Sequence, residues 1–152
     1  MKDTIRASFI DRIIDEAPLI PEEQVSRRTL TYNQFIYTLR RDLEWLLNTR
    51  NSVPAERYLE TDISVLEFGL PDITRLSPQN PSDRSHIALF IKKALNYYEH
   101  RLQEVEVIPF VPPNYVQSII YEIKGRLVYD DINEPISFRT ILDHEAGEFR
   151  II

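Results

Sequence analysis

The apolar residues of this chain recur at helical spacing in three early stretches and at alternate positions in four later ones. The helical stretches cover residues 4–16, 31–48 and 82–101. The strongest is 31–48, where Thr29 or Thr31 can cap the N-terminus and an apolar stripe runs over about four turns. The residues of that stripe are Tyr32, Phe35, Ile36, Leu39, Leu43, Leu46 and Leu47. This spacing predicts a helix with one buried face.

The first helical stretch, residues 4–16, is short and lies close to the N-terminus. Asp3 or Thr4 can cap it, and Pro18 ends it. Such a helix either packs on its own domain, which is the commoner case, or docks on a partner. We therefore expect one domain over residues 1–152, with 1–20 a possible partner-docking segment.

Residues 51–81 are rich in proline and read as a long loop. Within it, residues 61–68 predict one or two helical turns, capped by Thr61 or Asp62. Gly69 follows and predicts a turn with an unusual backbone angle. A long loop inside a compact domain is usually functional or packed by its own apolar residues.

The C-terminal third predicts strands at about 102–111, 115–130, 135–143 and 147–152. Alternation of apolar and polar residues in these stretches indicates a sheet with one buried and one solvated face. The segment 143–147 reads as a hairpin turn. Helices first and a strand meander last predict an α+β fold, with the helices packed on one face of a mainly antiparallel sheet.

The junction between the third helix and the first strand carries Glu99, His100 and Arg101. In one interpretation, Arg101 bridges Glu99 or Glu104 and caps the helix, where a cation is favoured. In the other, charges held rigidly at an element boundary serve recognition. On the residues alone the capping interpretation is favoured, since charges at helix ends commonly serve as caps.

Two further polar residues on the same helix extend this candidate surface. Lys92, Asn96 and Glu99 are spaced at i, i+4 and i+7, which predicts one shared polar stripe. On the 31–48 helix, Asp42 and Glu44 need partners wherever they are buried.

Net charge, cysteine content and hydropathy argue against several classes of function. The 152 residues carry a net charge of −6, which argues against a general nucleic-acid binder. The chain has no cysteine, which excludes disulfides, thiolate nucleophiles and zinc–thiolate sites. No apolar run approaches the roughly 20 residues that span a bilayer, so we expect no membrane insertion. The N-terminus lacks the apolar core of a secretory signal.

The sequence offers little for catalysis. Three isolated glycines cannot build a phosphate-binding loop, and no nucleophile elbow is present. His86, His100 and His144 lack metal-ligand spacing. Pairing Glu99 with Glu104 would give a glycosidase-like dyad, but acidic pairs on solvated segments are far commoner. We therefore expect no catalytic, cofactor-binding or metal-binding residues, and no enzyme.

Four segments, in order along the chain, resemble TssE, the baseplate subunit of type VI secretion systems. The longest, RRDLEWLLNTR at 40–50, is similar to the stretch RRDLExLLNTR of that family. The others are SFIDRI at 8–13, SVLEFGLPD at 64–72 and YEHRL at 98–102, similar to its SLLDRL, SVLNYGLPD and FEPRL segments. The wider family comprises the wedge proteins of contractile-tail baseplates, often labelled lysozyme-like.

The resemblance implies a structural subunit without a cofactor, in the cytoplasmic baseplate with TssF, TssG and TssK around the spike. It also implies that Glu99 and Arg101 match a Glu-Pro-Arg motif that holds the first layer of the TssB and TssC sheath. His100 replaces the proline of that motif, which leaves the backbone angle free and adds an amide donor. The partner-binding residues expected here are Glu99, His100, Arg101, Lys92 and Asn96. The alternatives are a small hydrolase of cell-wall glycan, as the family label suggests, and an adaptor of the same fold that binds a regulator.

Overall fold

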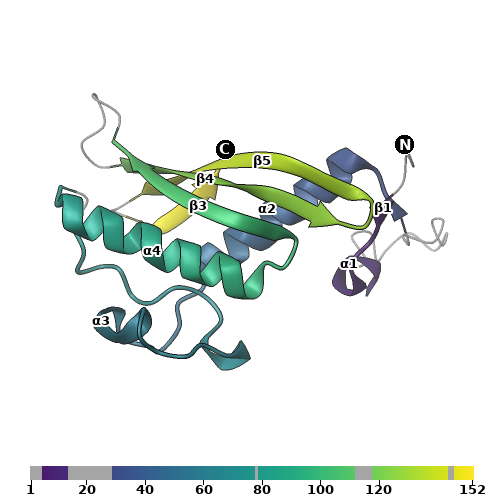
Figure 1. Ribbon diagram of the computed structural model, residues 1–152. Helices are drawn as coiled ribbons and strands as arrows, with labels where there is room; N and C mark the ends of the chain where they lie inside the picture. Colours follow the sequence, from purple (N-terminus) through teal and green to yellow (C-terminus); the bar gives the residue numbers. More distant parts are fainter. Residues whose placement is uncertain (1–4, 14–28, 78, 112–117, 144–145) are drawn as a thin grey trace. The chain divides into compact units, whose positions relative to one another are not determined.

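The computed structural model describes residues 5–13, 29–77, 79–111, 118–143 and 146–152. The chain divides into two compact units, residues 1–41 and 42–152, and the division falls within helix α2 (Tyr32–Asn48). Helices come first and a four-stranded antiparallel sheet comes last (Figure 1), so the predicted α+β class is confirmed.

The first unit contains a two-stranded ladder and a short helix. Strands β1 (Ile5–Arg6) and β2 (Thr29–Leu30) pair antiparallel, and helix α1 spans Phe9–Ile13. Ser8 caps α1, because its Oγ accepts from the amide of Asp11 at 3.2 Å. The prediction of one helix over 4–16 is therefore wrong at residues 5–8, since pairing with 29–30 extends the backbone there. The expected caps, residues 14–16 and Pro18 lie outside the described residues.

Helix α2 confirms the strongest sequence signal. Thr31 caps it as expected: Oγ1 of Thr31 accepts from the amide of Gln34 at 3.4 Å, and Oε1 of Gln34 accepts from the amide of Thr31 at 2.9 Å. This reciprocal arrangement satisfies backbone donors that a helix start leaves unpaired. The predicted apolar stripe is buried at five positions, Phe35, Leu39, Leu43, Leu46 and Leu47.

In the second unit, the end of α2 is followed by a long connection that holds two short helices, α3 (Ala55–Tyr58) and the 3-10 turn η1 (Val65–Glu67). Sequence reasoning missed α3. It placed the second turn correctly but chose the wrong cap: Ser64, not Thr61 or Asp62, caps η1 in a reciprocal arrangement with Glu67. The connection was expected to be packed by its own apolar residues Val65, Leu66, Phe68, Leu70 and Ile73. Leu70 and Ile73 are buried, together with Ile63, whereas Val65, Leu66 and Phe68 are exposed, so that expectation is wrong at these three positions.

Gly69 anchors the end of this connection. Its φ is +108°, and a Cβ added there would lie 2.3 Å from the carbonyl oxygen of Thr49. Close approach lets the amide of Leu70 donate to that oxygen at 2.9 Å. Only glycine combines this backbone angle with this contact.

Helix α4 (Pro81–Tyr98) carries the next large part of the core. Asn80 caps it by accepting from the amide of Ser82 at 2.9 Å, with Pro81 at the first helical position. The prediction of 82–101 was three residues too long, because Glu99 leaves the helical region with φ −107° and ψ 83°. The buried face of α4 comprises Ile87, Ala88, Phe90, Ile91, Ala94 and Leu95.

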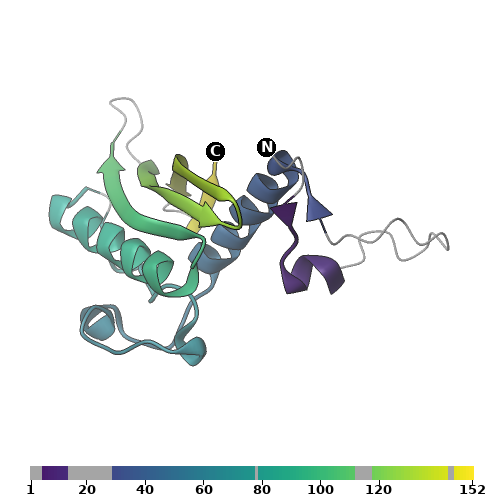
Figure 2. The same ribbon diagram turned by 45° about the vertical axis from the view of Figure 1, so that its right-hand side comes forward.

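The sheet is a meander of β3 (Leu102–Phe110), β4 (Ser118–Tyr129), β5 (Ile132–Asp143) and β6 (Glu148–Ile151), in that spatial order. All neighbours pair antiparallel, which confirms the four predicted strands. Helix α4 runs alongside β3 in both views (Figures 1 and 2). The buried positions alternate along β4 and β5 and include Ile119, Tyr121, Ile123, Phe138, Thr140 and Leu142.

The two edges of this sheet differ. Beside β6, the side chain of Asn48 exchanges hydrogen bonds with the amide and carbonyl of Phe149, each 2.8 Å long. The carboxylate of Glu44 accepts from the amide of Ile151 at 2.8 Å. Side chains of α2 thus occupy the backbone groups that an edge strand exposes. In the described part of the chain, no strand pairs with the outer side of β3.

Candidate functional site

The turn between α4 and β3 is short and tightly hydrogen-bonded. The amide of Glu99 donates to the carbonyl of Leu95 at 3.0 Å, and the amide of Leu102 donates to the carbonyl of Glu99 at 3.1 Å. The carboxylate of Glu99 turns back and accepts from the amide of Arg101 at 3.1 Å. Helix, turn and strand are therefore fixed relative to one another by Glu99.

Arg101 donates two parallel hydrogen bonds to the carboxylate of Glu99. Its Nε lies 2.7 Å from Oε1 of Glu99, and its Nη2 lies 2.6 Å from Oε2. The same Nη2 donates to Oδ2 of Asp42 on α2 at 2.8 Å. Glu99 is 7% exposed and the Arg101 side chain 15%. A guanidinium matches a carboxylate in this bidentate form better than any other side chain.

The charges in this cluster stabilise one another. Burial lowers the pKa of Arg101, but hydrogen bonds and charge from Glu99, and then from Asp42, outweigh burial and raise the pKa above its ordinary value. Arg101 therefore stays cationic. The side chains of Glu99, Arg101 and Asp42 together are here called the junction cluster.

Of the two partners considered for Arg101 in the sequence, Glu99 is the one found. Glu104 instead lies 3.4 Å from Arg126 on β4. Sequence reasoning did not identify Asp42 as a partner of Arg101, because the two residues are 59 positions apart. The signal available was only that an acid on α2 needs a partner if buried.

His100 lies between the two charged residues and is exposed. Within the described residues its amide donates no hydrogen bond. Glu99, the residue before it, has φ −107° and ψ 83°, outside the helical region. A proline at 100 disfavours the helical region for the residue before it, so this backbone meets one requirement of the proline found in the related motif.

A β-bulge follows the junction directly. The register of β3 against β4 shifts between Gln103 and Glu106, and Glu104 has a φ of +52°. Opposite the bulge stands Gly125, where an added Cβ would lie 3.0 Å from the carbonyl oxygen of Gln103. Bulges bend a strand and increase its local twist. This bulge therefore sets the direction in which β3, the edge strand, leaves the junction.

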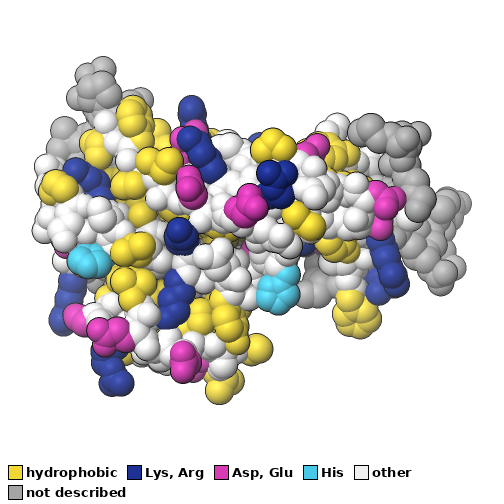
Figure 3. Space-filling view, in the orientation of Figure 1, with side chains coloured by type: hydrophobic (Ala, Val, Ile, Leu, Met, Phe, Trp, Pro, Cys, Tyr) yellow, Lys and Arg dark blue, Asp and Glu magenta, His cyan; other side chains and the backbone are white. Residues whose placement is uncertain are grey.

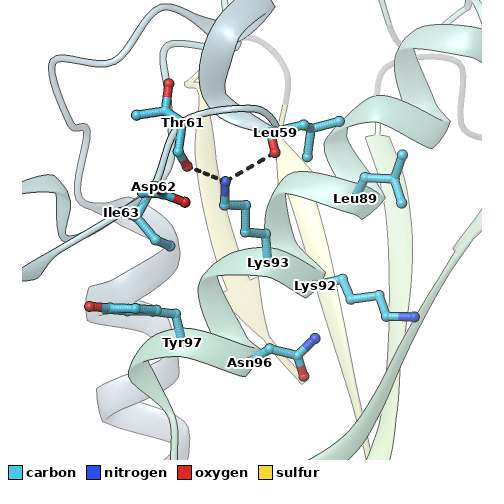
Figure 4. Close-up of a pocket in the computed structure, with 9 residues that line it drawn as sticks. All are labelled: Leu59, Thr61, Asp62, Ile63, Leu89, Lys92, Lys93, Asn96 and Tyr97. Atoms are coloured by element: carbon cyan, nitrogen blue, oxygen red, sulfur yellow. Dashed lines mark hydrogen bonds between the residues drawn. The ribbon is translucent and has the colours of Figure 1, made fainter.

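Lys92 and Asn96 are exposed on α4, whereas Glu99 is buried. The predicted polar stripe is therefore wrong at its third member, because the helix ends at Tyr98 and the chain turns Glu99 inward. Lys92 and Asn96 instead line an open groove of about 650 Å³ beside the segment 59–63 (Figure 4).

No cluster of three or more potential metal ligands occurs among the described residues. His86 is exposed on α4 and its ring stacks on Phe90, while His144 lies outside the described residues. No described helix is long and apolar enough to cross a membrane.

Comparison with known proteins gives one family. The family model described as baseplate wedge protein gp25 matches residues 35–131, which include α2, α4 and the junction cluster. No curated protein matches the chain. A solved structure described as the baseplate complex from the type VI secretion system is similar at 19% identity and a TM-score of 0.49, covering 72% of this chain and 94% of that one.

Proposed function

Because this chain belongs to the family of baseplate wedge protein gp25, we propose that it is a non-enzymatic structural subunit of a type VI secretion baseplate wedge. In this role it docks the contractile sheath and nucleates its assembly in the cytoplasm. Its proposed partners are TssF, TssG and TssK in the baseplate, near the spike, and TssB and TssC in the sheath. The family match across residues 35–131 carries the proposal, and the four ordered segments of resemblance favour the type VI system.

The proposed docking surface is the start of β3 together with residues 99–101. Strand β3 is at the edge of the sheet, and an edge strand offers unpaired backbone groups to which an extended segment can add. Exposed His100 adjoins this edge. Glu99 and Arg101 support docking by holding the turn rigid, and their charge gives orientation. Lys92 and Asn96 on α4 are proposed to extend the contact surface.

The test is sheath assembly in cells that produce altered chains. The variant His100→Glu changes an exposed side chain at the docking surface, and Arg139→Ala is the control, since the Arg139 side chain is 64% exposed on β5. We expect His100→Glu to reduce the number of labelled sheaths per cell, and Arg139→Ala to leave it unchanged. Circular dichroism of the purified chains checks folding. If the His100→Glu chain folds and sheaths still assemble normally, the proposal that this surface docks the sheath is wrong.

The identity of the partners is tested separately. Affinity purification of the chain from native cells should recover the baseplate and sheath proteins together. Recovery of a regulator in their place would favour the adaptor alternative.

The hydrolase alternative has a specific obstacle at Glu99. Both oxygens of this carboxylate accept hydrogen bonds from Arg101. A general acid must carry a proton, and a neighbouring guanidinium favours the ionised form. We expect purified chain to release no product from peptidoglycan. Turnover that disappears in Glu99→Gln would contradict the proposal.

A further inference from the structure

The groove beside α4 is lined on two walls by four apolar or aromatic side chains and by five polar or charged residues. One wall is the segment that follows α3, with Leu59 and Ile63; the other is the face of α4 with Leu89 and Tyr97 (Figure 4). Leu89 is 47% exposed and Tyr97 43%. In the space-filling view, hydrophobic side chains gather over this lower part of the molecule, with both basic and acidic ones among them (Figure 3).

Lys93 fixes the distance between the two walls. Its Nζ donates to the carbonyl oxygens of Tyr58 at 2.7 Å, Leu59 at 3.2 Å and Thr61 at 2.6 Å. An ammonium has three donors, and all three are used. The groove is therefore preformed, which lowers the entropy cost of binding.

The side chain of Lys92 points in another direction than that of Lys93. Figure 4 shows Lys93 pointing to the 59–61 backbone and Lys92, which also lines the groove, extending away from that backbone. Lys92 is exposed, and no described residue forms an ion pair with it. Two lysines and one acid, Asp62, line the groove, so it is positive within a chain whose net charge is −6.

The length of the α4 wall and the spacing of its side chains indicate which kind of partner segment fits the groove. The residues facing the groove, Leu89, Lys92, Lys93, Asn96 and Tyr97, recur at helical spacing, and Leu89 to Tyr97 spans about 12 Å at the rise of an α-helix. Two helices pack when such ridges interdigitate over about two turns. Apolar anchors at i, i+3, i+4 and i+7 are the form in which a partner helix enters a groove.

We propose that this groove binds a short amphipathic helix of a partner protein, with apolar side chains between Leu59, Leu89 and Tyr97 and a carboxylate opposite Lys92. The inference rests on the proposed function, which assigns Lys92 and Asn96 to partner binding, and it names what they contact. The groove is a second site, distinct from the edge of β3 that receives the sheath. An acidic helix is favoured because two cations, Lys92 and Lys93, and one anion, Asp62, line the groove, and the exposed Lys92 forms no ion pair with a described residue.

The probe is a synthetic acidic peptide of about 14 residues, the length at which an isolated helix becomes marginally stable. It places leucine at helical spacing and glutamate on the flanks; a matched basic peptide has lysine at each glutamate position. Binding to the full chain is measured by fluorescence anisotropy, and the site is mapped by amide chemical shifts. No sheath or baseplate protein is present, so failure here leaves the sheath test unaffected.

Two groove variants and one matched control decide the outcome. Leu89→Glu should weaken the acidic peptide about tenfold or more, as expected for an apolar anchor. Lys92→Glu should weaken the acidic peptide about threefold to tenfold and strengthen the basic one. Ile108→Glu is the control, because Ile108 on β3 is 43% exposed, close to Leu89 at 47%. It should change neither affinity.

Three results would overturn the inference. These are equal affinity for the two peptides, shift changes centred away from residues 59–63 and 89–97, or equal effects of Leu89→Glu and Ile108→Glu. Self-association of the chain without peptide, abolished by Leu89→Glu, would assign the groove to a second copy instead.

Discussion

The side chain of Asn48 pairs with the backbone of Phe149 as a neighbouring strand would. Its Nδ2 donates to the carbonyl and its Oδ1 accepts from the amide, both at 2.8 Å. One helix residue thereby satisfies both polar groups of a buried residue in the sheet. The same sheet leaves its other edge, β3, without a strand partner among the described residues. Of the two edges, β3 is therefore the one available to an added strand.

Replacing Asn48 by alanine should destabilise the fold by about 1–3 kcal/mol, because the amide and carbonyl of Phe149 lose their partners. Urea unfolding followed by circular dichroism measures this. Asn96→Ala is the matched control: Asn96 is exposed on α4, so its loss should change the free energy of unfolding by less than about 0.5 kcal/mol. Equal effects of the two changes would show that the Asn48 bonds contribute nothing.

Arg101→Ala should cost roughly 3 kcal/mol, since it leaves Glu99 buried without its cation and Asp42 with one partner fewer. Chemical denaturation is again the measurement, with Arg139→Ala as the exposed arginine control. A loss below about 1 kcal/mol would mean that the cluster behaves as a surface pair.

His100→Pro should leave the free energy of unfolding unchanged or raise it by up to about 1 kcal/mol. Proline restricts the unfolded chain, and the His100 amide has no hydrogen bond to lose among the described residues. Thermal unfolding of both chains tests this. A strong loss of stability would show that position 100 needs a backbone angle that proline cannot take.

Gly69→Ala should destabilise strongly, by about 3 kcal/mol or more, because strain at a positive φ adds to a clash with the Thr49 carbonyl. Gly147→Ala separates the two causes. Gly147 has a φ of +67°, but an added Cβ would meet nothing within 4 Å, so only about 1–2 kcal/mol of strain is expected. Similar losses in the two variants would exclude the clash.

Local pattern was sufficient for the elements with long, regular signals. The stripe of α2 and the alternation of β4 repeat over many residues, so backbone preference and burial agree there. Short elements were missed or displaced because a few residues are too few to show a period. Helix α3 has four residues, too few for a period, and β1 forms only because residues 29–30 pair with it.

The sequence by itself determined the α+β class, the position of the charged pair at the boundary between α4 and β3, and the family resemblance, because each depends on residues close together in the chain. Only the tertiary structure decided that Asp42 completes the junction cluster and that Lys93 holds the wall of the groove. Both depend on side chains meeting residues more than 30 positions away. Spacing along the chain carries no information on such meetings, since they follow from how the helices pack around the sheet.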